Sequence, residues 1–251
     1  MAIWQKQLTH NPIPPLLASE DRALTYFTRR DLLGEEVPDI SMVWELPEVI
    51  NILKKQQPDG SWKYPGKKSP DCYPDHHYPL VETWKQFRFL IDKYQISKIH
   101  PELQKAAEYL FTCQTDAGDF RGFIGNQYAT YYTGALLSLL IKAGYTDDPR
   151  IERGFRWLLS MRQDDGGWTI PILTANLSWD EQIKATSRKR PPIEPDSSKP
   201  FSHNWTGMIL RAFAEDPKYR ESEEALSAAK LLKSRFFKPD LYNPTGQPIT
   251  G

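Results

Sequence analysis

The residues best suited to chemistry lie in one short segment. Asp71, Cys72, Asp75, His76 and His77 bring carboxylate, thiol and imidazole groups close together in the sequence. Such groups, as thiolate, imidazole and carboxylate, can complete a tetrahedral zinc shell with one open position. The segment is also rich in proline, and we favour the simpler interpretation of a polar loop with solvated histidines.

Aromatic residues form a second group with possible chemistry. Tyr78, Tyr132 and Trp205 stand at comparable points near the starts of expected helices, and Trp84 and Tyr131 lie nearby. Ring faces attract cations and pack against apolar ligands. These rings therefore predict an aromatic-lined binding cavity, with a core simply filled by rings as the alternative.

Composition limits the classes of function. The 251 residues carry 32 basic and 32 acidic side chains, and this balance argues against a nucleic-acid-binding surface. Two distant cysteines, Cys72 and Cys113, do not form a disulfide framework, and the first residues show no signal peptide, so we expect a cytoplasmic protein. The longest apolar run, 135–141, is too short to span a bilayer.

A repeated motif of glutamine, glycine and an aromatic residue indicates how these groups are positioned. Its three copies are Gln57-x-x-Gly60-x-Trp62, Gln114-x-x-x-Gly118-x-Phe120 and Gln163-x-x-Gly166-x-Trp168. Each follows a stretch with apolar residues at helical spacing. Pro47, Pro101 and Pro149 stand where these helices would begin, and proline is favoured at a first helical position.

A second helix is expected after each motif. The segments 132–137 and 205–210 match each other, and the helix over about 128–143 is apolar on nearly every side, so it should be buried all round. The helices before the motifs carry charges on one face and should be peripheral. A further helix is expected over 21–33.

The pattern predicts an all-α protein with inner and outer helices in a double-layered α/α array. We expect a single domain over 1–251, with repeats at about 45–97, 98–146, 147–215 and a degenerate unit at 216–251.

The three motif copies resemble the QW motifs of squalene–hopene and oxidosqualene cyclases, which are related to the repeats of protein prenyltransferase β-subunits. The resemblance covers roughly 45–242. It implies an α/α toroid, in which the motif glutamine ties down a neighbouring helix terminus and the aromatic ring stacks over it. It also implies an isoprenoid or other apolar ligand in a central cavity. Because a fold hosts many functions, the chemistry must be argued separately.

The acid motifs of this superfamily are missing. No Asp-x-Asp-Asp and no Asp-Asp-x-x-Asp sequence occurs: the pair 147–148 lacks the first aspartate, and the pair 164–165 lies in the third motif, where we expect a turn. The prenyltransferase resemblance implies a zinc site of Asp, Cys and His with an Asp-x-Cys spacing. Here Asp71 and Cys72 are adjacent, and His76 or His77 with the distant His203 would complete the set.

Three functions stay open. The first is a prenyltransferase- or terpene cyclase-like protein that binds or transforms an isoprenoid. The second is a non-catalytic α/α repeat scaffold or binding module. The third is a carbohydrate-active α/α-toroid enzyme, which needs paired carboxylates, and Glu82 with Asp147 and Asp148 are the available ones.

The long segment 169–203 and the number of repeats suggest partners. A loop of this length serves as a lid, a partner contact or an insertion. Its basic run, 188–190, could meet a diphosphate or an anionic membrane surface, although solvation is the simpler role. A closed toroid needs five or six helix pairs and we count four, so we expect either further C-terminal repeats or an open horseshoe completed by a partner or a second copy.

Overall fold

The computed structural model describes residues 7–70, 72–187 and 190–242. Within these residues the secondary structure is helical, with three isolated bridges as the only strand-like pairings. The all-α prediction is therefore confirmed. The helices are α1 (Ile13–Leu17), α2 (Arg22–Phe27), the π-helix η2 (Thr28–Leu32), α3 (Ser41–Trp44), α4 (Pro47–Leu53), α5 (His77–Tyr94), α6 (Pro101–Thr112), α7 (Thr130–Lys142), α8 (Pro149–Ser160), α9 (Pro171–Thr174), α10 (Trp179–Ser187), α11 (His203–Glu215) and α12 (Glu223–Ser234).

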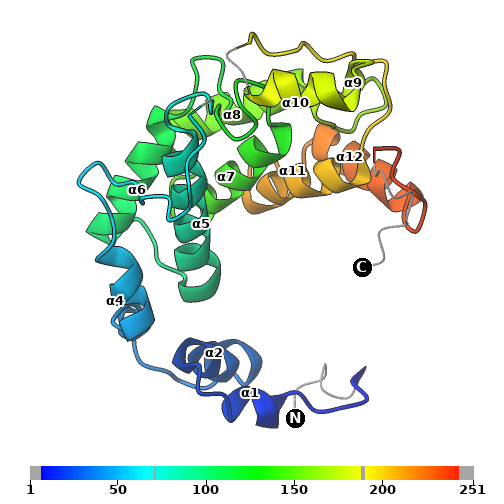
Figure 1. Cartoon of the computed structure of the whole chain (residues 1–251). Helices are drawn as coiled ribbons and strands as arrows, with labels where there is room; N and C mark the ends of the chain where they lie inside the picture. The colour runs from blue at the N-terminus through cyan, green and yellow to red at the C-terminus, as the bar shows by residue number, and fades with distance from the viewer. Residues whose placement is uncertain (1–6, 71, 188–189, 243–251) are drawn as a thin grey trace.

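Outer and inner helices alternate along the chain. The outer helices α4, α6 and α8 each begin at the proline that the sequence indicated, and α12 begins after the N-cap Ser222. The inner helices are α5, α7 and α11, and α7 packs against both of the others. The helices follow a curve, with α1 and α2 near one end and α12 near the other (Figure 1).

Helix α7 lies at the centre of this arrangement. Most of its residues are buried, as its apolar sequence predicted. Gly134 allows α11 to approach closely, because a Cβ at this position would lie 2.9 Å from the Cα of Ile209. The α7–α11 contact thus depends on one position without a side chain.

Each motif turn is attached to the following inner helix by the same hydrogen bond. The backbone N–H of the motif aromatic residue donates to a threonine Oγ1: Trp62 to Thr83 at 3.0 Å, Phe120 to Thr133 at 3.1 Å and Trp168 to Thr206 at 2.8 Å. These threonines lie on α5, α7 and α11. A single type of contact therefore sets the depth of all three inner helices against the motif turns.

The motif turn also binds the next outer helix, and here the structure corrects the first motif. Gln56, not Gln57, occupies the position of Gln114. The Gln56 Nε2 donates to Gly60 O at 3.0 Å and to Glu102 O in α6 at 2.8 Å. The Gln114 Nε2 makes the same pair of bonds, to Gly118 O and to Arg150 O in α8, both at 2.9 Å. The helix-tying role of the motif glutamine is thus present one residue earlier than predicted.

The third turn divides this role between two residues. Arg162 takes the Gln56 position, donating to Gly166 O at 2.9 Å and to Ser227 Oγ in α12 at 3.0 Å. Gln163, the predicted motif residue, donates instead to the carbonyl oxygens of Asp196 and Lys199, both at 2.8 Å. Gln163 therefore fastens the long segment 169–203 to the same turn.

The corrected register predicts unequal effects of two adjacent substitutions. Gln56→Ala leaves two carbonyl groups without their donor and should lower the free energy of unfolding by about 1–3 kcal/mol. Gln57 is exposed. Gln57→Ala should therefore change stability by less than about 0.5 kcal/mol. Urea denaturation of both variants measures the difference, and equal losses would show that the register is wrong.

The close approach of turn and outer helix predicts a second pair of effects. Gly118 has φ +116°, and a Cβ there would overlap the Arg153 carbonyl oxygen of α8. Gly118→Ala should cost more than about 3 kcal/mol through strain and displacement of α8. Gly34 also has positive φ, at +66°, but open space around it. Gly34→Ala should cost only about 1–2 kcal/mol, and a thermal melt in which both variants lose equally would contradict the overlap.

Candidate functional site

Four of the five aromatic residues selected from the sequence lie together. The ring of Trp84 on α5 is 5.1 Å from that of Tyr132 on α7, Tyr132 is 4.4 Å from Tyr131, and Tyr131 is 4.5 Å from Trp205 on α11. We call these four residues the aromatic row. Each of its helices carries a row residue next to the threonine that binds a motif turn, so the turns position the rings.

Phe123 extends the row and was missed in the sequence. Its ring stacks on Tyr132, with centroids 3.9 Å apart and planes at 12°. Phe123 comes from the turn between Gly122 and Gly125, which form an isolated bridge. The two glycines around Phe123 are the signal that could have identified a tight turn facing the inner helices.

Tyr78, the fifth aromatic residue, lies apart from the row. Its ring is 4.8 Å from Tyr64, and its hydroxyl accepts a hydrogen bond from the backbone N–H of Ser69 at 2.6 Å. Tyr78 therefore holds the segment before α5 rather than lining the row.

The aromatic row is neutral, with a cation at one end. Burial raises the pKa of Tyr131, so its phenol stays protonated. The Arg88 guanidinium lies 4.8 Å from the centre of the Trp84 ring. The Trp84 Nε1 is buried and has no acceptor among the described residues. The row thus combines ring faces with a few neutral polar groups, the two tyrosine hydroxyls and the indole N–H groups, and it suits an apolar or flat molecule.

A cavity of about 350 Å³ lies next to the row. Phe123 and Ile124 line it from the turn before α7, and Thr186 and Ser187 from the end of α10. Cys72 lines it from the segment before α5, and His77 from the first residue of that helix. Phe123 is shared between this cavity and the row, so a molecule in the cavity would touch the stacked ring.

The proposed zinc ligands have other partners. A ring nitrogen of His76 bonds the carbonyl of Arg121 at 2.9 Å, and one of His77 bonds the carbonyl of Gly122 at 2.6 Å. Burial raises the pKa of the Cys72 thiol, which disfavours the thiolate that zinc requires. Both histidines thereby hold the turn of Phe123 against the start of α5.

No group of three or more possible metal ligands exists within the described residues. His203 lies elsewhere, at the start of α11, where it accepts from Arg235. The described side chains therefore do not fit a three-residue zinc site. Asp71 is outside the described residues, and zinc stays a prediction from the sequence.

The carboxylates considered for acid chemistry serve the fold. Glu82 is buried and accepts from Gln86 on its own helix at 2.6 Å. Asp148 is the N-cap of α8 and pairs with Arg150, which lowers the pKa of its carboxyl. Asp165 accepts from the backbone of Phe201 at 2.8 Å, in the turn expected for it. Glu82 thus lies in an inner helix and Asp148 at the start of an outer one. Each carboxylate is bonded to a residue close to it in the sequence.

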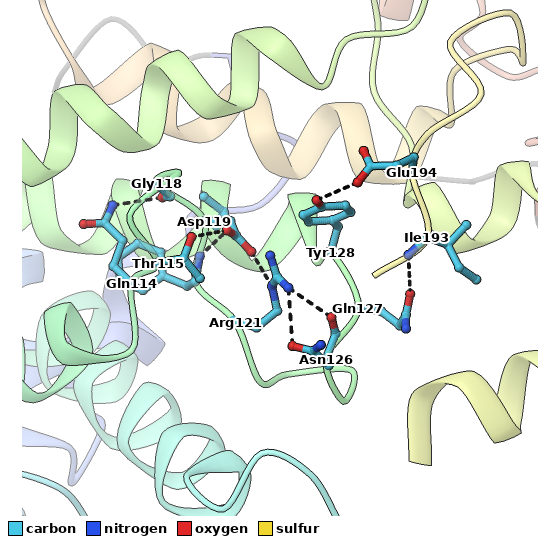
Figure 2. Close-up of polar contacts among 12 residues, drawn as sticks. Gln114, Thr115, Gly118, Asp119, Arg121, Asn126, Gln127, Tyr128, Ile193 and Glu194 are labelled. Carbon is cyan, nitrogen blue, oxygen red and sulfur yellow. Dashed lines mark hydrogen bonds and ion pairs between the residues drawn. The ribbon is translucent and has the colours of Figure 1, made fainter. Parts of the chain in front are cut away.

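The long segment 169–203 is attached beside the row by polar side chains from the turn before α7 (Figure 2). The Gln127 amide accepts from Ile193 N at 2.9 Å and donates to Pro191 O at 3.2 Å, and the Tyr128 hydroxyl donates to Glu194 at 3.0 Å. Apolar residues of the segment, Ile170 and Ile172, pack near Tyr131 and Trp205. The segment thus covers one end of the row.

A buried ion pair supports this turn. Asp119 is fully buried and accepts from Arg121 Nε at 2.6 Å and from the Thr115 hydroxyl (Figure 2). The Arg121 guanidinium lies 4.6 Å from the centre of the Tyr128 ring and donates to Asn126 O at 3.1 Å. Of the basic run, 188 and 189 lie outside the described residues. The backbone carbonyl of Arg190 accepts a hydrogen bond from the Asn126 side-chain amide. None of the described helices has the length and apolar character needed to cross a membrane.

Two comparisons with known proteins bear on this arrangement. Residues 80–188 match the family model of the squalene-hopene cyclase C-terminal domain. A solved structure, that of a protein from Actinoplanes, is similar to this chain with a TM-score of 0.35 and 16% sequence identity, over 82% of this chain and 70% of that chain. The second likeness is too weak to carry an argument, so the relationship rests on the family model.

The matched segment runs from α5 through α10 and holds three of the four rings of the aromatic row. Over this segment the chain is similar to the squalene-hopene cyclase C-terminal domain.

Proposed function

We propose that this protein binds an isoprenoid or a similar apolar ligand against the aromatic row. The observation that carries the proposal is the unbroken series of ring contacts from Trp84 through Tyr132 and Tyr131 to Trp205, across three inner helices. An apolar ligand would gain contact with several ring faces at once, and any positive charge on it would be stabilised by them.

Binding without the usual cyclase reaction is the form of the proposal that the residues favour. The sequence holds no Asp-x-Asp-Asp acid, and the buried Glu82 is already bonded to Gln86. The row offers apolar contacts, and the adjacent cavity of about 350 Å³ adds polar side chains such as His77 and Thr186, a combination common in ligand sites.

A non-catalytic scaffold is the second candidate, and the stacking of Phe123 on Tyr132 at 3.9 Å favours it. Rings that pack closely against one another can fill a core without binding a ligand. The two functions differ in whether the row binds anything.

The test is calorimetric titration of the protein with farnesol and with squalene. Wild type should bind one of them at a single saturable site, and Trp205→Ala should weaken binding about tenfold, or about 1.4 kcal/mol. Trp205→Phe should restore most of the affinity, because it restores a ring face. Trp179 is a matched control, since its side chain is 73% exposed and outside the row; Trp179→Ala should bind as wild type does.

Circular dichroism must show that each variant is folded. If folded wild type binds neither compound, or if Trp179→Ala loses as much affinity as Trp205→Ala, the ligand proposal fails and the scaffold function stands.

A further inference from the structure

A second cavity, which shares no residue with the aromatic row, lies between α11 and α12. It has a volume of about 290 Å³, near the lower end of ligand cavities. Its floor includes Gly207, Met208 and Leu232, and Phe236 and Phe237 stand at its edge. These two rings are 62% and 71% exposed, so apolar surface faces water here. We call this cavity the α11–α12 groove.

The repeat explains why the groove is open. Gly207 on α11 corresponds to Gly134 on α7, because each follows the threonine that binds a motif turn. A Cβ on Gly134 would meet Ile209 of the next inner helix at 2.9 Å. A Cβ on Gly207 would meet only Leu232, at 3.8 Å. The face of α7 around Gly134 therefore packs tightly on α11, whereas the equivalent face of α11 around Gly207 has no such contact within the described residues.

Three cations surround this apolar surface. Arg211, Arg235 and Lys238 all line the groove. None of the three forms an ion pair with any described carboxylate, although Arg150, Lys218 and several other cations of the chain do. An uncompensated positive edge around an apolar floor is complementary to an anion that carries an apolar chain.

The groups beside these cations leave their charge available. Burial lowers the pKa of His203, and its neutral ring accepts from Arg235 Nε at 3.4 Å, which orients the guanidinium without neutralising it. The nearby Asp240 carboxylate accepts from Ser202 Oγ at 2.8 Å and from Asn204 N at 3.1 Å. These bonds hold the carboxylate at the start of α11, where it forms no ion pair with the three cations.

We propose that the α11–α12 groove binds an amphiphile with one apolar chain and a single anionic head group, a carboxylate or a phosphate. The chain would lie on Met208 and Leu232 between the two phenylalanines, and the head group would meet Arg211, Arg235 and Lys238. The site is separate from the aromatic row and does not depend on the function proposed for it.

The probes are decanoate and decyl phosphate, titrated below their critical micelle concentrations, and the neutral 1-decanol, titrated below its solubility limit. Decanoate or decyl phosphate should bind one site per chain, and decanol at least about tenfold more weakly, because it lacks the charge. The stronger of the two anions identifies the head group. Rising salt should weaken the anions and leave decanol unchanged.

Two variants test the place of binding. Arg211→Gln with Lys238→Gln should weaken the anions about tenfold or more. Gly207→Leu should abolish binding of the two anions, since its side chain fills the groove. The matched control is Lys230→Gln with Lys233→Gln, two exposed cations of α12 that do not line the groove. This control should bind the anions as wild type does.

The proposal is overturned by equal binding of decanol and decanoate, by anion binding that survives Gly207→Leu, or by the absence of anion binding to wild type. Sedimentation velocity tests whether a second copy of the chain, rather than a small amphiphile, occupies the groove. If wild type is a dimer that Gly207→Leu dissociates, the groove is a subunit interface and the proposal is wrong.

Discussion

The hydrogen bond from a motif-turn N–H to an inner-helix threonine is the contact on which the arrangement depends. The aromatic residues that donate it are almost completely buried, with Phe120 and Trp168 at 0% exposure and Trp62 at 3%. A buried N–H without an acceptor costs about 1–3 kcal/mol, so the threonine must stand opposite the turn. The indole N–H groups meet the same demand, since Trp62 donates to Ile52 O at 2.8 Å and Trp168 to Leu158 O at 2.7 Å.

This constraint positions the site as well as the fold. Each threonine has a row residue beside it in the sequence: Trp84, Tyr132 or Trp205. The hydrogen bond that fixes the threonine therefore also fixes the direction in which the neighbouring ring points. Tyr132 and Trp205 precede their threonines and so occupy equivalent positions, whereas Trp84 follows Thr83; the repeat therefore accounts for two of the rings. Gly134 contributes by letting α11 approach α7, which brings Trp205 within 4.5 Å of Tyr131.

The sequence was sufficient for features that depend on local chemistry or on a repeated pattern. The prolines located the outer helices, and the match between 132–137 and 205–210 located two of the inner ones. It also identified Tyr132 and Trp205, which meet through Tyr131, because equivalent positions in a repeat have equivalent surroundings.

Features that depend on one residue of register, or on distant partners, were not accessible. Gln56 and Gln57 are adjacent, and only the three-dimensional turn decides which amide reaches α6. The histidines fit a zinc site by type, but the backbone of a turn some 45 residues away binds them instead. The Phe123 turn has no helical periodicity; its flanking glycines indicate a tight turn but not which rings the turn meets.

Helix α11 contributes to both proposed sites with opposite chemistry. Trp205, near its start, joins the neutral row, whereas Arg211, further along, belongs to the cationic edge of the groove. Contacts with ring faces depend on shape and apolar area and are almost insensitive to salt, while an exposed cationic edge acts through a field that salt screens. A neutral isoprenoid would therefore favour the row, because it offers nothing to the cations, and an anionic amphiphile would favour the groove. One helix, held at one depth by Thr206, can thus serve two ligands that do not compete.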